Sequence, residues 1–304
     1  MRVSEIMEQR MAFSFEVFPP KTDEGMKKLV GEGGTLEHLY ELHPDYISCT
    51  YGAGGGNVGK NLEVLDAVKA AGVATPVTHF TCIGNTKEGI KEQLQTYLDH
   101  GIDHMLALRG DLPYGWTGTN GDLHYATELV KFVRQEFDDK FSIAVSGSPE
   151  GHIACRSLEA DISFLRQKQD EGADYIMTQL CFDMDAFRYW MDAIRNAGIW
   201  LPVDVGIMPV LDSQAVINMC LSRNACVMPR ELCEVITHHW IFPGESEESI
   251  AAKKAAFKEE GIEYTIKLID EYRVCGIDGV HLYALNKYQD VARIVKESGI
   301  VDLL

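Results

Sequence analysis

One carboxylate near the end of a strand-like segment stands out as a residue that could do chemistry. Glu16 lies in the run from Phe13 to Val17, whose aromatic and β-branched residues are typical of a β-strand. Two prolines, Pro19 and Pro20, end the run. Side chains alternate along a strand, so Glu16 lies on the face opposite to the large apolar residues. Burying a carboxylate for packing alone is costly, so this position favours a chemical role, with a solvated edge-strand carboxylate as the alternative.

Other residues with reactive or hydrogen-bonding side chains follow the ends of further strand-like segments. They are Thr50, His79, Arg109, Asp111, His152, Gln179, Tyr283 and Lys287. In a barrel of parallel strands the carboxyl ends meet on one face, where the active site forms. Carboxylates there can exchange protons, because apolar walls raise the pKa of one and a nearby cation lowers that of another. An amide such as Gln179 suits two-point recognition of a heterocycle. The pattern predicts a large pocket and an enzyme.

The glycine-rich segment after the second strand-like run does not complete a nucleotide motif. Residues 54–60 read G-x-x-x-x-G-K, but Asn61 stands where a P-loop needs serine or threonine for magnesium. No G-x-G-x-x-G sequence occurs at a strand-to-helix turn. The sequence therefore argues against a nucleoside triphosphate site and against a flavin or nicotinamide held in Rossmann fashion.

Two histidines and one charged pair have structural alternatives. His79 and His152 lie on different segments, with no carboxylate or second histidine at ligand spacing, so we expect no metal site. For His79 a hydrogen bond to a cofactor and a buried core position both remain open. Arg109 and Asp111 alternate onto one face, and an ion pair that closes the barrel end is their alternative interpretation.

Eight strand-like runs alternate with amphipathic segments of helical period. The first seven runs start 27 to 37 residues apart, and the last interval is more than twice as long. Alternating strands and helices imply a parallel sheet, and eight such units fit a closed (β/α)8 TIM barrel of one domain over residues 1–304. The expected strands are Ala12–Phe18, Asp45–Tyr51, Pro76–Ile83, His104–Gly110, Phe141–Ser146, Tyr175–Phe182, Pro202–Met208 and Gly279–Leu285. Extra helices are expected between strands seven and eight, at Ser213–Cys220, Arg230–Thr237 and about Glu247–Tyr272.

Composition limits the classes of partner. The formal net charge of −18 argues against binding to nucleic acid or to an anionic membrane surface. Eight scattered cysteines without a C-x-x-C pair, and no signal peptide or membrane-length apolar segment, predict a reduced cytoplasmic protein without disulfides or structural zinc.

Several motifs together resemble the bacterial methylenetetrahydrofolate reductase family, in its form with a catalytic domain only. They are F-S-F-E-V-F-P-P at 13–20, T-Y-G-A at 50–53, H-F-T-C-I at 79–83, A-L-R-G-D-L-P at 107–113, T-Q at 178–179 and Y-A-L-N-K at 283–287. The resemblance spans nearly the whole chain. It implies a (β/α)8 barrel in which a bound flavin reduces 5,10-methylenetetrahydrofolate to 5-methyltetrahydrofolate, after NAD(P)H has delivered a hydride to flavin N5.

The resemblance also implies roles for single residues. Glu16 is expected to be the general acid that opens the five-membered ring of the substrate to an iminium ion. Asp111 is expected beside the flavin and the folate, and Gln179 at the pterin. The residues that fall where the family binds FAD are Thr50, His79, Arg109, Gly110, Asp111, His152, Asp161 and Lys168. Tyr283 and Lys287 fall near the substrate.

Three positions depart from the family pattern. Ser213 stands where well-known bacterial members have a phenylalanine that stacks on the dinucleotide, Ser148 replaces a tyrosine, and Lys287 replaces an arginine. They leave FMN as an alternative to FAD and another electron donor as an alternative to NADH. We expect a homo-oligomer, and Ser213 motivates a complex with an iron–sulfur or zinc electron-transfer subunit as a second hypothesis. A pterin-binding methyltransferase barrel without flavin is a third.

Overall fold

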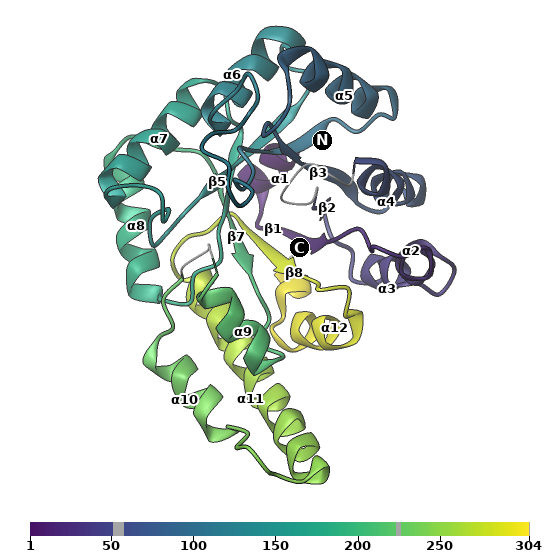
Figure 1. The fold of residues 1–304 in the computed structure, drawn as a ribbon, viewed down its shortest axis with the longest axis vertical. Helices are drawn as coiled ribbons and strands as arrows, with labels where there is room; N and C mark the ends of the chain where they lie inside the picture. The colour runs from purple at the N-terminus through teal and green to yellow at the C-terminus, as the bar shows by residue number, and fades with distance from the viewer. Residues whose placement is uncertain (51–57, 223–225, 304) are drawn as a thin grey trace.

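The computed structural model is a closed barrel of eight parallel strands in sequence order (Figure 1). It describes residues 1–50, 58–222 and 226–303. Every strand pairs in parallel with its neighbours, and β1 pairs with both β2 and β8, which closes the barrel. The predicted (β/α)8 fold is confirmed. The strands are β1 Ala12–Val17, β2 Tyr46–Cys49, β3 Thr75–Thr81, β4 His104–Leu108, β5 Ser142–Gly147, β6 Tyr175–Thr178, β7 Val203–Ile207 and β8 Gly279–Tyr283.

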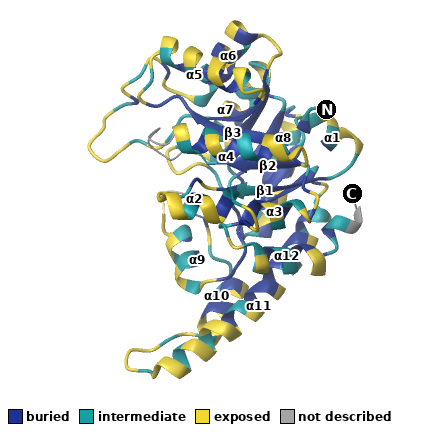
Figure 2. Ribbon diagram, turned by 90° about the vertical axis from the view of Figure 1, so that its right-hand side faces the viewer, coloured by how far each residue is buried: buried dark blue, intermediate teal, exposed yellow. Residues whose placement is uncertain are grey.

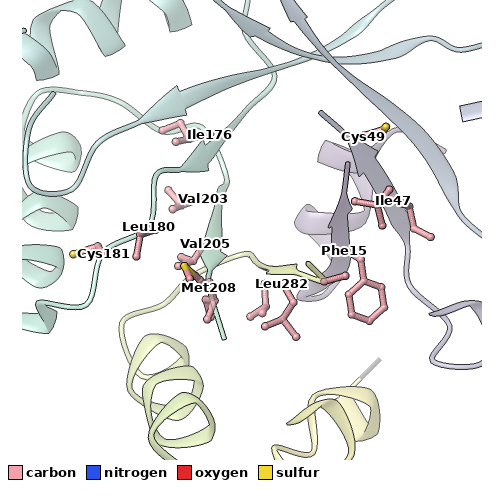
Figure 3. Packing of buried hydrophobic residues seen from close by; sticks show 14 of the residues in the cluster. Phe15, Ile47, Cys49, Ile176, Leu180, Cys181, Val203, Val205, Met208 and Leu282 are labelled. Carbon is pink, nitrogen blue, oxygen red and sulfur yellow. The ribbon is translucent and has the colours of Figure 1, made fainter. Parts of the chain in front are cut away.

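Alternation along β1 divides the apolar residues from the polar ones. Phe13, Phe15 and Val17 belong to the large apolar cluster between the barrel and its helices. Part of this cluster is drawn in Figure 3, where Phe15 lies near residues of neighbouring strands. Ser14 and Glu16 face the barrel interior, because they contact residues of other strands there. Burial of each large apolar side chain contributes roughly 1.5–3 kcal/mol, which fixes the register and therefore the direction in which Glu16 points.

A second, smaller apolar cluster fills the lower interior of the barrel. It contains interior residues of several strands, among them Tyr46 and Tyr175, together with Val3 and Met7 from helix α1. Helix α1 (Val3–Gln9) lies before the first strand and covers the amino-terminal end of the barrel. The barrel is thus closed at this end, and polar groups in its lower interior are shielded from solvent.

Helices alternate with the strands, and three of them form the expected addition before β8. In Figure 1 helices α10 and α11 extend away from the barrel, and in Figure 2 the residues at their far end are mostly exposed. The helices are α1 Val3–Gln9, α2 Asp23–Val30, α3 Thr35–Tyr40, α4 Val58–Ala71, α5 Lys87–Asp99, α6 Ala126–Phe137, α7 Leu158–Asp170, α8 Met184–Asn196, α9 Ser213–Cys220, α10 Arg230–His238, α11 Glu247–Arg273 and α12 Tyr288–Glu297, with a 3-10 turn at Ile300–Leu303.

The predicted boundaries are wrong mainly at the carboxyl ends of strands. The sixth strand was expected to reach Phe182 but ends at Thr178, because the chain there turns toward α8, whose first N–H groups are capped by Asp183. Helix α5 is capped by Thr86, whose hydroxyl accepts from the N–H of Gly89. In the part of the chain that the structure describes, no helix has both the length and the apolar character that crossing a membrane requires.

Candidate active site

Glu16 is the last interior residue of β1, and its carboxyl group is held in apolar surroundings. The side chain is 22% exposed, and burial raises the pKa of the carboxyl to about 7. Its oxygen Oε2 lies 3.6 Å from Nε2 of His79 on β3 and 3.9 Å from Nε2 of His281 on β8. Near neutral pH a substantial fraction of Glu16 is therefore protonated and able to act as an acid.

The two histidines beside Glu16 are neutral. Burial lowers the pKa of His79 to about 4, and it lowers the pKa of His281 well below its usual value, with the nearby His79 adding to the effect. Ser48 Oγ lies between the rings, 3.1 Å from Nε2 of each. Its hydroxyl therefore links two imidazoles that belong to different strands.

This cluster qualifies the expectation about metals. Among the described residues, Glu16, His79 and His281 are the group of potential ligands whose donor atoms lie within 4.8 Å of one another. The carboxylate and the second histidine beside His79 lie far from it in the sequence, so no ligand spacing indicated them. Because Ser48 already engages both Nε2 atoms through hydrogen bonds, we assign the cluster to hydrogen bonding around Glu16.

A cavity of about 1090 Å³ opens beside this cluster, over the carboxyl ends of β2 to β6. It brings together most of the residues singled out in the sequence. Those that line it are Thr50, His79, Arg109, Gly110, Asp111, His152, Asp161, Lys168 and Gln179. Tyr283 lies in β8 and Lys287 at the start of α12, and neither belongs to this lining. The residues Tyr51 to Ala53 of the T-Y-G-A motif lie outside the described part of the chain.

Lys168 and Arg109 face the cavity, and no carboxylate among the described residues lies within ion-pairing distance of either. Lys168 on α7 donates from Nζ to the carbonyl oxygen of Ser146 at 2.8 Å, and burial lowers its pKa. Arg109 donates from Nε to the carbonyl of Gly110 at 3.2 Å and forms no ion pair with Asp111. Uncompensated cations in a chain of net charge −18 are suited to an anionic ligand. The donor set therefore fits the phosphate groups of a flavin nucleotide.

Other cavity residues hold the surrounding loops. The N–H of His152 donates to Asp161 Oδ2 at 3.2 Å, and its Nδ1 accepts from the N–H of Ala154. Burial lowers the pKa of His152. Gln179 follows β6, where its own N–H donates to the carbonyl of Gly147 and its Oε1 accepts from the N–H of Leu180. Asp111 is exposed at the cavity. These residues line one cavity, but no ligand contact tests their predicted roles.

Gly110 adopts a backbone conformation that other residues avoid. Its φ is +93°, and a Cβ atom at this position would lie 2.5 Å from Cγ2 of Ile83. The chain turns sharply after β4 for this reason, which places Arg109 and Asp111 on the same loop at the cavity. Similarly, Gly206 on β7 leaves room for the hydroxyl of Tyr283, since a Cβ there would lie 2.7 Å from it.

Comparison with known proteins identifies the family. The methylenetetrahydrofolate reductase family model matches residues 2–299. The chain belongs to this family. A methylenetetrahydrofolate reductase (NADH) 1 from Arabidopsis thaliana is 31% identical over 317 residues, which cover 99% of this chain and 50% of the relative. A 5,10-methylenetetrahydrofolate reductase from Salmonella typhimurium is 34% identical over 197 residues, which cover 65% of this chain and 64% of the relative. The chain spans about half the length of the plant relative.

A solved structure supports the fold of this family member. It is an uncharacterized protein from Clostridium thermocellum that binds two copies of 5-methyl-5,6,7,8-tetrahydrofolic acid. It aligns with a TM-score of 0.68 over 99% of both chains, at 13% sequence identity. At this identity the similarity establishes the barrel fold alone.

Sequence reasoning missed four buried polar residues beneath Glu16. They are Ser48, His281, Tyr46 and Asp204, and each points into the barrel interior. Asp204 is fully buried and is the second residue of β7. A usable signal was present, because each residue is polar at an interior position of an otherwise apolar strand. These residues do not stand at the carboxyl ends of strands, so the pattern of polar strand ends did not include them.

Proposed function

We propose that this chain reduces 5,10-methylenetetrahydrofolate to 5-methyltetrahydrofolate with a bound flavin. The observation that carries the proposal is Glu16, a carboxyl group with a pKa of about 7 beside a cavity whose cations suit an anionic cofactor. Membership of the family and the reductase names of the matched relatives support the same reaction.

Glu16 supplies a proton to the substrate. Its carboxyl hydrogen moves to the ring nitrogen that leaves, the electron pair of the breaking C–N bond stays on that nitrogen, and a carbon–nitrogen iminium is left. Glu16 becomes a carboxylate in this step. The neutral state of His79 and His281 matters here, because a cationic imidazole at 3.6 or 3.9 Å would keep Glu16 ionised.

The remaining residues bind and orient. Arg109 and Lys168 would hold the phosphate groups of the flavin, and Gln179 would meet the pterin ring. When bound, the flavin supplies the hydride that reduces the iminium carbon. Asp111, exposed on the loop after β4, would lie where it can contact both rings. Tyr283 and Lys287 remain proposed substrate contacts outside this cavity.

The electron donor is proposed to be NADH, as in the name of the plant relative. FMN in place of FAD, and a partner subunit with an iron–sulfur or zinc centre, remain the alternatives, motivated by Ser213 at the start of α9. An anaerobic titration of the flavin-loaded protein with NADH, followed by absorbance, decides between the donors. Bleaching with recovery after addition of methylenetetrahydrofolate is the expected result. A bound flavin that NADH fails to bleach would point to a partner subunit.

Replacement of Glu16 tests the proposed acid. Glu16→Gln should lower the rate of flavin reoxidation by methylenetetrahydrofolate by about a hundredfold or more, because general acid catalysis contributes that much. Flavin reduction by the donor should stay unchanged, since it needs no acid at this position. Stopped-flow absorbance measures the two half-reactions separately.

The matched control is Glu88→Gln, the same chemical change at an exposed glutamate in the first turn of α5. It should leave both half-reactions intact. Loss of both half-reactions in Glu16→Gln would contradict the acid role. A protein that binds pterin but no flavin would instead favour the methyltransferase hypothesis.

A further inference from the structure

A continuous set of hydrogen-bonding side chains runs through the barrel interior below Glu16. We call it the interior column, and it consists of Asp204, Tyr46, Ser14, His281, Ser48 and His79. Its members come from β1, β2, β3, β7 and β8, so no stretch of sequence contains it. One end is Asp204 in the closed lower part of the barrel, and the other end is His79 beside Glu16 and the cavity.

The lower end of the interior column has a fixed direction. Tyr46 donates its hydroxyl hydrogen to Asp204 Oδ2, and above about pH 7, where Asp204 is ionised, this carboxylate can only accept. Asp204 fits against β8 because residue 279 is glycine, where a Cβ would lie 2.7 Å from Oδ1. The hydroxyl proton of Tyr46 thus points to Asp204, and the Tyr46 oxygen can only accept hydrogen bonds from the residues nearer to Glu16.

The direction of the Tyr46 hydrogen bond determines which ring nitrogen of His281 carries the proton. Ser14 Oγ donates to the carbonyl oxygen of Val280 at 3.4 Å, and the Ser14 hydroxyl also acts on Tyr46, whose pKa it lowers. The carbonyl has no proton and the proton of Tyr46 goes to Asp204, so both groups can only accept from Ser14. The 2.6 Å contact between Ser14 Oγ and His281 Nδ1 must then be donated by Nδ1–H. Because His281 is neutral, its Nε2 carries no proton and acts as an acceptor.

The same reasoning sets the ring of His79. Nε2 of His281 accepts the proton of Ser48 at 3.1 Å, which leaves the Ser48 oxygen to accept from Nε2–H of His79, also at 3.1 Å. Neutral His79 is then unprotonated at Nδ1. We propose that Asp204 is a positioning residue, which sets the tautomers of His281 and His79 through the interior column.

The tautomers have a consequence for Glu16, and this part rests on the proposed function. The Nε2–H of His79, which donates to Ser48 Oγ at 3.1 Å, also lies 3.6 Å from Glu16 Oε2, so a shift of under about 1 Å turns this donor from Ser48 toward the carboxylate. That donor stabilises the carboxylate that remains after Glu16 has given its proton to the substrate. Asp204 contributes to this without touching the cavity.

Nitrogen-15 NMR of protein labelled at histidine tests the proposal directly. Protonated and unprotonated ring nitrogens resonate far apart, and the signals of the two histidines are assigned from His79→Gln and His281→Gln. The measurement is made at about pH 8, where Asp204, whose pKa burial raises to about 7, is mostly ionised. The expected result is a proton on Nδ1 of His281 and on Nε2 of His79.

Tyr46→Phe removes the hydroxyl that joins Asp204 to the rest of the interior column, so it should produce mixed or reversed tautomers in both histidine rings. The matched control is Tyr175→Phe. The hydroxyl of Tyr175 lies in the same buried cluster as Tyr46 but has no hydrogen-bond partner among the described residues. The control should keep the wild-type tautomers. If Tyr46→Phe does not fold, the isosteric substitution Asp204→Asn tests the same link, and it should also change the tautomers of both histidines.

Opposite tautomers in the wild type, or unchanged tautomers in Tyr46→Phe and Asp204→Asn, would overturn the proposal. A kinetic readout accompanies the spectra. Folate reduction by the pre-reduced protein should slow on the order of tenfold in Tyr46→Phe, the effect of losing one hydrogen bond to a charged group, while flavin reduction and Tyr175→Phe stay unchanged. If the wild type reduces no folate, the proposed function fails while the spectra still decide the tautomers.

Discussion

At the scale of single residues, Glu16 combines partial exposure with a raised pKa. The carboxyl can reach a substrate, yet desolvation keeps it protonated to about pH 7. The groups around it do not titrate in the same range. His79 and His281 are held neutral, and burial moves the pKa values of Cys49 and Tyr283 well above neutrality. Glu16 is therefore tuned by its apolar surroundings rather than by a charged neighbour.

This tuning predicts a pH-dependent stability difference between the wild type and Glu16→Gln. Burial raises the pKa of Glu16 from 4.5 to about 7, so the folded state binds the Glu16 proton more tightly than the unfolded state does. The free-energy cost of ionising Glu16 in the folded protein is therefore absent below about pH 4.5 and complete above about pH 7. Glutamine has no such penalty. The variant should therefore gain free energy of unfolding relative to wild type between pH 5 and 8, by at most about 3 kcal/mol.

Urea unfolding at several pH values measures this difference. Asp204, with a pKa of about 7, titrates in the same interval but is present in both proteins, so its contribution cancels. A difference that stays constant with pH would mean that Glu16 is ionised in the folded protein. That result would also remove the basis for its proposed acid role.

At the scale of elements, the loops after the strands carry the candidate site, and the strands hold these loops in place. The loop after β4 carries Arg109 and Asp111, and its path depends on Gly110. Alanine at 110 meets both an unfavourable φ and Ile83, so Gly110→Ala should lower stability by about 1–3 kcal/mol and weaken flavin binding. Thermal unfolding and a flavin fluorescence titration check the two effects.

Gly118→Ala is the control for this substitution. Gly118 lies in the segment between β4 and α6, and nothing would lie within 4 Å of its Cβ. It should fold and bind flavin as the wild type does. Equal behaviour of both alanine variants would show that the turn after β4 tolerates a side chain and that the loop positions the site in another way.

At the scale of the whole molecule, the strongly negative net charge contrasts with the unpaired cations of the cavity. An anionic cofactor is repelled by the overall charge and attracted locally by Arg109 and Lys168. Lys168→Met should therefore weaken flavin binding by about tenfold or more and reduce the dependence of binding on salt. Equilibrium titration at low and moderate ionic strength measures both quantities.

The matched change is Lys131→Met on α6, which alters the net charge equally but removes an exposed lysine paired with Glu171. It should change flavin affinity little. Similar losses in both variants would mean that overall charge, and not the cavity, controls binding. The homo-oligomer and the electron-transfer subunit remain predictions, which the size of the purified protein and its co-purifying chains would test.

The barrel and most of the cavity lining could be predicted from local patterns in the chain. Strand alternation and the spacing of the βα units depend on local periodicity, and a parallel barrel brings strand ends together whatever its details. Thr50, Arg109 and Gln179 could therefore be assigned to one site in advance. The family motifs added the role of Glu16 as an expectation.

The residues beneath Glu16 could not be predicted in this way, because they come together only in the folded barrel. The contacts of Ser14 with His281, and of Tyr46 with Asp204, join residues separated by 267 and 158 positions. Their pairing depends on the closure of β1 on β8 and on the register of every strand between. The pKa of Glu16 also follows from burial by these elements. Such properties arise from contacts between residues far apart in the sequence, and local sequence patterns carry no direct information about these contacts.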